Sequence, residues 1–374
     1  MTDPESAASV PPRAGARSLL IKLAISLLVA GFFVFLLRQG ALELWPGEKA
    51  FAAVDWQSVA WSVVLLCVQQ FIRAARWYFL LAPVQRVPLR TVLRVAFIGF
   101  FAISIMPIRT GEVVRPLLMR REGKISGWIA TGTVAAERLI DGFFLSSSLF
   151  VALLLAKPHE PLPDRIGDLP VPVSLVPTAA YSAVTFFTAA LVVMALFYLF
   201  RAQARRLIER TVGRVSLAFA DALSDRIGQV ADGLRFLPQV RYTLPFLVST
   251  LAYWAIAACA WTLIGRACGL ELGYFQATAV MGVVALGILV PNAPGFFGAF
   301  QLGCYAGLAM YFDRETVLGA GSMYVFLMYA LQMTVPAVTG LVAIAVKPDA
   351  LRGLYEFGPS PAPPEKLAPA NDSR

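Results

Sequence analysis

The chain has 374 residues, of which 58% are hydrophobic and only 15% are charged, and its mean hydropathy is +0.69. Apolar runs of about 18 or more residues recur along it, long enough for an α-helix to cross a bilayer, so the composition excludes a soluble globular protein. The net charge of +9 arises largely in loops that flank these runs, where control of membrane topology explains it without nucleic acid as a partner. Too little polar chain remains for a separate soluble catalytic domain.

Six segments are long and apolar enough to cross a membrane, which predicts an all-α polytopic membrane protein. They are residues 19–37, 58–81, 128–156, 177–200, 243–266 and 316–346. Basic residues precede the first segment and no small-residue cleavage site follows it, so we expect a retained span rather than a signal peptide. Residues 1–18 are then a cytoplasmic tail, residues 19–346 the membrane domain, and residues 347–374 a Pro-rich, disordered cytoplasmic tail.

The apolar piece at residues 95–108 is too short for an ordinary span. Residues 109–124, which follow it, carry five positive charges against two negative, and the positive-inside rule keeps such a segment in the cytoplasm. We therefore expect the piece to dip into the membrane from the cytoplasmic side as a re-entrant hairpin. Parity along the chain then requires residues 274–312 to form a second hairpin from the outer side. Two opposed hairpins are typical of an inverted repeat and point to a translocation site.

The longest polar stretch, residues 201–241, carries eight arginines against four acidic residues and is the strongest cytoplasmic signal in the chain. Apolar residues recur in it at three- and four-residue steps, which predicts an amphipathic helix linking the two halves of the domain. Two interpretations stay open. The helix lies on the membrane interface, or it packs on the protein's own loops.

Polar residues follow the first hairpin. Arg109 and Arg115 are suited to bidentate recognition of a phosphate, and Glu112 shares a helical face with Arg115, so we expect these three residues to bind a lipid headgroup. The alternative is that the arginines only set topology. Arg73 and Arg76, near the inner end of the second span, are further headgroup candidates, although snorkelling toward the interface also explains them.

Three charged residues, Glu137, Arg138 and Asp141, lie inside the third span. An unpaired charge at the centre of a bilayer costs about 2.5–3.5 kcal/mol even on a lenient insertion scale. Glu137 and Asp141 share a face at i and i+4, and Arg138 is able to pair with Asp141 or with Glu112. We expect these residues to form a polar path. A structural ion-pair cluster that pins the hairpin to the span needs the same geometry and is the alternative.

The second hairpin is broken near its centre by residues that end helices or allow close backbone approach. These residues are Pro291, Asn292, Pro294, Gly295, Gly298 and Gln301. The backbone groups freed there either receive a headgroup on the outer side or bond one another and water.

Motifs for covalent chemistry are absent from the sequence. It contains no nucleophile beside a base, no phosphate-binding loop, no metal-ligand cluster and no nucleotide fingerprint. We therefore expect no catalytic residues, no metal and no cofactor, and no coupling to ATP within the chain.

In these motifs the chain resembles the lysylphosphatidylglycerol synthase transmembrane-region family, also called flippase-like membrane proteins. The resemblance covers nearly all of the membrane domain and rests on residues 73–77, 106–115, 136–141 and 291–298. It implies a role in moving or handling a polar lipid between leaflets. In two-domain members of the family a soluble aminoacyl-transferase domain makes the lipid, and this chain looks like the flippase part standing alone. The family usually has an acid where Gln301 stands, and its loss argues against a cationic, lysyl-like headgroup.

We therefore predict a flippase of the bacterial inner membrane, with both termini in the cytoplasm, that moves a phospholipid or a hopanoid- or isoprenoid-type lipid. Membrane lipids are its expected partners, and the sequence does not indicate an oligomeric state. Two other classes stay open. One is an intramembrane transferase that modifies a lipid with Glu137 or Asp141 as base. The other is a subunit that anchors a soluble lipid-synthesis enzyme through residues 201–241.

Overall fold

The computed structural model describes residues 28–40, 42, 45–106, 111–211, 217–289 and 293–349, except for the side chains of residues 204, 205, 207–209 and 217–220. Its helices are α2 (Glu48–Ala52), α3 (Trp56–Ala75), α4 (Trp77–Leu81), α5 (Leu89–Ile105), α6 (Val114–Glu122), α7 (Gly127–Leu155), η2 (Val173–Leu175), α8 (Val176–Leu199), α9 (Arg201–Thr211), α10 (Leu217–Asp232), α11 (Val240–Ala267), α12 (Tyr274–Gly287), η4 (Pro294–Phe296), α13 (Ala299–Leu308), α14 (Arg314–Leu318) and α15 (Ala320–Val346). Over the described residues the only β-type pairing is an isolated bridge between Ile166 and Leu169. The predicted all-α class is confirmed.

Five helical stretches are long and apolar enough to cross a membrane. They are Trp56–Leu81, Gly127–Leu155, Val173–Leu199, Val240–Ala267 and Arg314–Val346. They match five of the six predicted segments, and the chain is a multi-pass membrane protein. The remaining predicted segment is residues 19–37. The structure describes the apolar helix Leu28–Gln39 in this region, while residues 19–27 lie outside the described residues.

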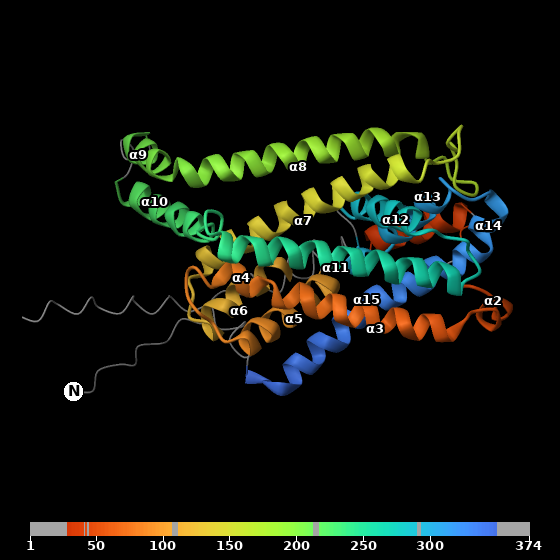
Figure 1. Cartoon of the computed structure of the whole chain (residues 1–374), viewed down its shortest axis with the longest axis horizontal. Coiled ribbons are helices and arrows are strands. Elements are labelled where there is room, and N and C mark those ends of the chain that lie inside the picture. Colours follow the sequence, from red (N-terminus) through yellow and green to blue (C-terminus); the bar gives the residue numbers. More distant parts are fainter. Residues whose placement is uncertain are drawn as a thin grey trace, which may run out of the picture.

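Two pairs of shorter helices lie toward opposite ends of the bundle (Figure 1). α5 packs along α6 toward the end that holds α9 and α10, and α12 packs along α13 toward the end that holds α2 and α14. Glycine lets the second pair approach closely, because a Cβ at Gly303 or Gly307 would lie 2.8 Å from a Cα atom of α12. The two pairs lie in the parts of the sequence where the two hairpins are predicted, and their re-entrant course stays a prediction.

The break in the second helix pair contacts the end of the first. Gly295, in the turn η4, has a φ of 67°, a left-handed conformation that favours glycine. A Cβ at this position would lie 3.0 Å from the hydroxyl of Tyr329 and 3.6 Å from the carbonyl oxygen of Ser104, near the end of α5. The break between α12 and α13 and the end of α5, distant in sequence, are therefore in contact.

The polar stretch at residues 201–241 is divided rather than being one helix. It holds α9, α10 and a turn at residues 233–239 before α11 begins. The end of α10 rests on α7, because a Cβ at Gly132 would lie 2.3 Å from the carbonyl oxygen of Val230 and Ser126 donates a hydrogen bond to Gln229. This part of the stretch packs on the protein, but against the span α7 rather than against loops.

Buried apolar side chains form two main clusters. One surrounds α12, α13 and α15. The other is built by α4, α5, α6 and the first half of α7, and it includes Trp77, Phe100 and Phe246. The second cluster encloses most of the polar residues that the sequence singled out.

Candidate functional site

Arg76 occupies the break between α3 and α4, with only 1% of its surface exposed. Its guanidinium donates hydrogen bonds to Asp141 Oδ2 at 2.7 Å and to Glu137 Oε1 at 3.3 Å. A third hydrogen bond reaches Thr250 Oγ1 at 2.7 Å. Snorkelling toward the interface is therefore the wrong interpretation of Arg76, because its partners on α7 and α11 hold it in the interior.

The two acids of α7 face Arg76 from one side of that helix, which confirms the face predicted from their spacing. Glu137 is 0% exposed and Asp141 is 7% exposed. Asp141 also accepts a hydrogen bond from the Tyr253 hydroxyl at 2.9 Å. Buried carboxylates need such partners, since an isolated charge in the membrane interior is costly.

Arg115 projects from α6 and is fully buried. Its two Nη atoms donate to the two carboxylate oxygens of Glu137 at 3.1 and 2.8 Å, which is the bidentate geometry that arginine favours. Its aliphatic stem crosses α5 at Gly99, where a Cβ would lie 2.1 Å from the Arg115 Cγ. The guanidinium lies over Trp77, 4.2 Å from the ring centroid. The predicted phosphate-binding fork is thus used by a carboxylate of the protein itself.

Two uncharged residues of α11 complete the group, and neither was predicted from the sequence. Thr250 is 0% exposed and Tyr253 is 1% exposed. Thr250 accepts from Arg76 and donates to the carbonyl oxygen of Phe246 at 2.8 Å. The available signal was their spacing of three residues in a mostly apolar span, which places both on one helical face.

Two further arginines lie at the edge of this group. Arg138, whose side chain is 29% exposed, donates to Glu137 Oε1 at 3.1 Å, so its partner is not the predicted Asp141 or Glu112. Glu112 nevertheless remains within electrostatic reach of Arg138. Arg73, on α3, is partly exposed, and its guanidinium lies 4.3 Å from the centroid of the Phe100 ring.

We call these residues together the charge cluster. Its members are Arg73, Arg76, Glu112, Arg115, Glu137, Arg138, Asp141, Thr250 and Tyr253. Removing one partner of a buried ion pair typically costs about 3–5 kcal/mol, so the pairs of the cluster hold one another in place. Ion pairing and hydrogen bonding inside a membrane are the chemistry that these groups offer. Among the described residues, no group of three or more His, Cys, Asp or Glu side chains is placed to hold a metal ion.

The other predicted site residues lie elsewhere. Three are outside the part of the chain that the structure describes: Arg109, Pro291 and Asn292. Four form or follow the break between α12 and α13: Pro294, Gly295, Gly298 and Gln301. The side chain of Gln301 accepts a hydrogen bond from the backbone N–H of Gly298 at 2.7 Å and so caps the start of α13.

A second group of ions ties the end of α6 to α5 and to the residue after α15. Glu122 accepts hydrogen bonds from Arg94 at 2.5 Å and from Lys347 at 2.7 Å. Partial burial alone raises the pKa of Glu122, but the hydrogen bonds from Lys347 and Arg94 outweigh it and hold that pKa below its ordinary value of 4.5. This group is a structural link at one end of the bundle.

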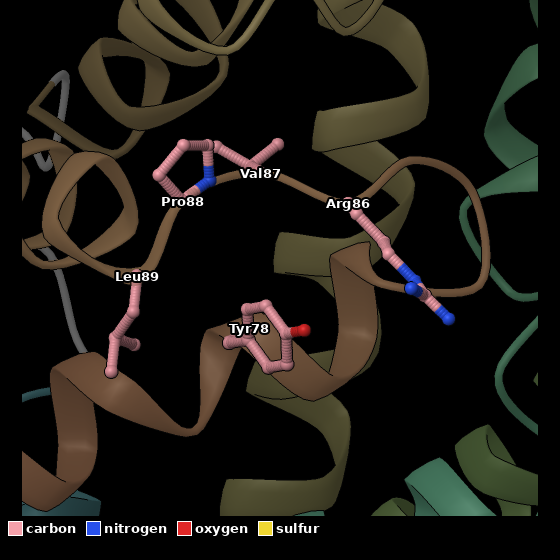
Figure 2. Close-up of a pocket in the computed structure, with 5 residues that line it drawn as sticks. All are labelled: Tyr78, Arg86, Val87, Pro88 and Leu89. Carbon is pink, nitrogen blue, oxygen red and sulfur yellow. The ribbon is translucent and has the colours of Figure 1, made fainter.

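A surface pocket of about 540 Å³ lies where α4 leads into α5. It is lined by Tyr78, Arg86, Val87, Pro88 and Leu89, and Figure 2 shows the side chains of Arg86 and Leu89 on either side of the Tyr78 ring. No member of the charge cluster lines this pocket. The charge cluster is the stronger candidate for the functional site. Charged side chains in the membrane interior are energetically costly and often mark transport sites, whereas a surface pocket carries no such cost.

Comparison with known families gives one match. The model described as the lysylphosphatidylglycerol synthase TM region matches residues 19–335, which include every member of the charge cluster. No curated protein and no solved structure matches the chain.

Proposed function

Because the chain belongs to the lysylphosphatidylglycerol synthase transmembrane-region family, we propose that it moves a polar lipid from one leaflet of a membrane to the other along the charge cluster. The headgroup passes the cluster while the acyl chains stay in the surrounding lipid. The membrane is the bacterial inner membrane, with both termini in the cytoplasm.

The position of the cluster is the observation that carries this proposal. Asp141 lies 14 residues from either end of α7, and Tyr253 lies 13 residues after the first residue of α11 and 14 before the last. At a rise of about 1.5 Å per residue, their hydrogen bond is roughly 20 Å from the ends of both spans. Charged groups at that depth mark transport pathways more often than packing sites.

The two helix pairs provide the route in this proposal. We propose that α5 with α6 and α12 with α13 are re-entrant, entering from opposite sides of the membrane. The contact between Gly295 and the end of α5 supports this arrangement, since irregular backbone at membrane depth is stable only where protein or a polar cavity surrounds it. Arg115, on α6, then links the first hairpin to Glu137 of α7.

Leaflet exchange in vesicles tests the proposal. The purified protein is reconstituted with fluorescent phospholipids, and the fraction that a membrane-impermeant quencher reaches is followed over time. We expect exchange by the wild-type protein and at least tenfold slower exchange by Glu137→Gln, because three arginines lose their shared carboxylate. Asp168→Asn is the matched control, since it removes an ion pair at the surface, with side chains that are 55% and 64% exposed.

Folding is checked by gel filtration and circular dichroism, and Tyr253→Phe is a milder variant that keeps every charge. A folded Glu137→Gln protein that exchanges lipid at the wild-type rate contradicts the proposal. Mass spectrometry of the same lipids distinguishes lipid movement from the transferase alternative, because a transferase would produce a lipid of changed mass.

A further inference from the structure

We propose that the headgroup accepted by the charge cluster is anionic, a phosphate without a compensating positive charge, and that Arg73 and Arg138 bind it. This inference rests on the proposed function and names the class of lipid that the same site accepts.

The cluster holds more guanidinium groups than carboxylates. Arginine side chains remain protonated in proteins. The cluster contains four of them: Arg73, Arg76, Arg115 and Arg138. Its acids are Glu137 and Asp141, which are hydrogen-bonded within it, and Glu112, which interacts with Arg138 electrostatically. The described residues of the cluster thus carry four positive charges against three negative. A bound phosphate monoanion neutralises the excess, whereas a cationic headgroup increases it.

The four arginines fall into two pairs. We call the fully buried, ion-paired arginines the closed pair and the partly exposed arginines the open pair. Arg76 and Arg115 have 0% exposed side chains and bond to Glu137, Asp141 and Thr250. Arg138 has a 29% exposed side chain and, among the described residues, one hydrogen bond. Arg73 is also partly exposed, and none of the described residues accepts a hydrogen bond from it. The closed pair fixes the acids, and the open pair retains free N–H groups for a ligand.

The unsatisfied atoms at this edge of the cluster are donors. The Nε atoms of all four arginines of the cluster are buried without a hydrogen-bond partner among the described residues. So is the Nε2 atom of Gln70, one turn before Arg73 on α3. In contrast, all four carboxylate oxygens of Glu137 and Asp141 already accept at least one hydrogen bond. The spare donors beside these two filled carboxylates suit phosphate oxygens, while an ammonium group brings only donors.

The Phe100 ring holds the Arg73 guanidinium without using its N–H groups. The distance of 4.3 Å to the ring centroid is within cation–π range. The side chain is therefore oriented before a ligand arrives, which reduces the entropy lost on binding.

Exchange of lipids whose headgroups carry a net negative charge, no net charge or a net positive charge tests this inference. Vesicles carry fluorescent phosphatidylglycerol, phosphatidylcholine or a diacyl trimethylammonium lipid, with wild-type, Arg73→Gln or Arg314→Gln protein. We expect wild-type protein to exchange phosphatidylglycerol about tenfold or more faster than the other two, the effect of one charge-assisted hydrogen bond. Arg73→Gln removes this preference and lowers the melting temperature less than Glu137→Gln does, because among the described residues it loses the contact with Phe100 but no ion pair. Arg314→Gln, which breaks only a surface pair, keeps the preference.

Equal exchange of all three lipids by wild-type protein overturns the anion inference and leaves lipid movement standing. If no lipid exchanges, the proposed function fails. A binding assay then tests separately whether the cluster holds an anion site. Phosphatidylglycerol that raises the melting temperature of detergent-solubilised wild-type protein but not of Arg73→Gln supports an anion site. No such difference overturns it.

Discussion

Gly99→Ala tests whether the Arg115 fork depends on the absence of a side chain on α5. The new Cβ would lie 2.1 Å from the Arg115 Cγ and 2.9 Å from its Cδ, near the root of the side chain, so the whole chain must move. Both hydrogen bonds to Glu137 are then lost, at 2.8 and 3.1 Å. Breaking a buried ion pair costs about 3–5 kcal/mol, and the helical preference of alanine returns about 1 kcal/mol, which leaves a net loss of about 2–4 kcal/mol.

Thermal unfolding in detergent measures this effect, and Gly228→Ala is the matched control. A Cβ at Gly228 of α10 meets nothing within 4 Å, so this substitution should leave the melting temperature unchanged or raise it. At roughly 2 °C or more per kcal/mol, Gly99→Ala should lower the melting temperature by about 4–8 °C and abolish lipid exchange. If Gly99→Ala melts like Gly228→Ala and still exchanges lipid, the role assigned to the Arg115 fork is wrong.

Two further predictions concern single polar groups. Tyr253→Phe removes the hydrogen bond to Asp141 and should destabilise the protein by about 1.5–3 kcal/mol, seen as a lower melting temperature than that of wild type; identical melting would contradict a structural role for the hydroxyl. The carboxylate of Glu122 has a lowered pKa, so its stabilisation is complete above pH 4.5 and is lost as the pH falls through the folded-state pKa. The melting temperature of the wild type should therefore fall more steeply on acidification than that of Glu122→Gln. An equal fall for both proteins would show that the ion pairs of Glu122 do not stabilise the fold.

The spans of this protein could be predicted because length and hydropathy decide whether a helix crosses a bilayer. The shared face of Glu137 and Asp141 could also be predicted, since helical geometry fixes side chains four residues apart. Their partners could not. Tyr253 lies 112 residues from Asp141, and only the packing of α11 beside α7 brings them together.

Arg76 shows why a local interpretation failed. A basic residue near the end of a span is able to snorkel, and sequence alone cannot show that tertiary partners offer a better alternative. Here Thr250, Glu137 and Asp141 supply three acceptors in the interior. The periodic apolar residues of the stretch at 201–241 likewise indicated helix but not the turn before α11, because a short turn barely disturbs the pattern.

The charge cluster has a structural interpretation and a transport interpretation, and a double substitution separates them. Glu137→Gln alone leaves buried guanidiniums without a counter-charge, and Arg115→Met alone removes two of the hydrogen bonds to Glu137. Together the two changes remove one charge of each sign, so the double variant should be more stable than the sum of the single losses predicts. If the cluster only pins α6 to α7, this rescue of stability restores lipid exchange as well. If the headgroup passes between these charges, the double variant melts near wild type and exchanges no lipid. Wild-type exchange by a stable double variant would refute the path along Glu137 and leave the ion pairs a purely structural role.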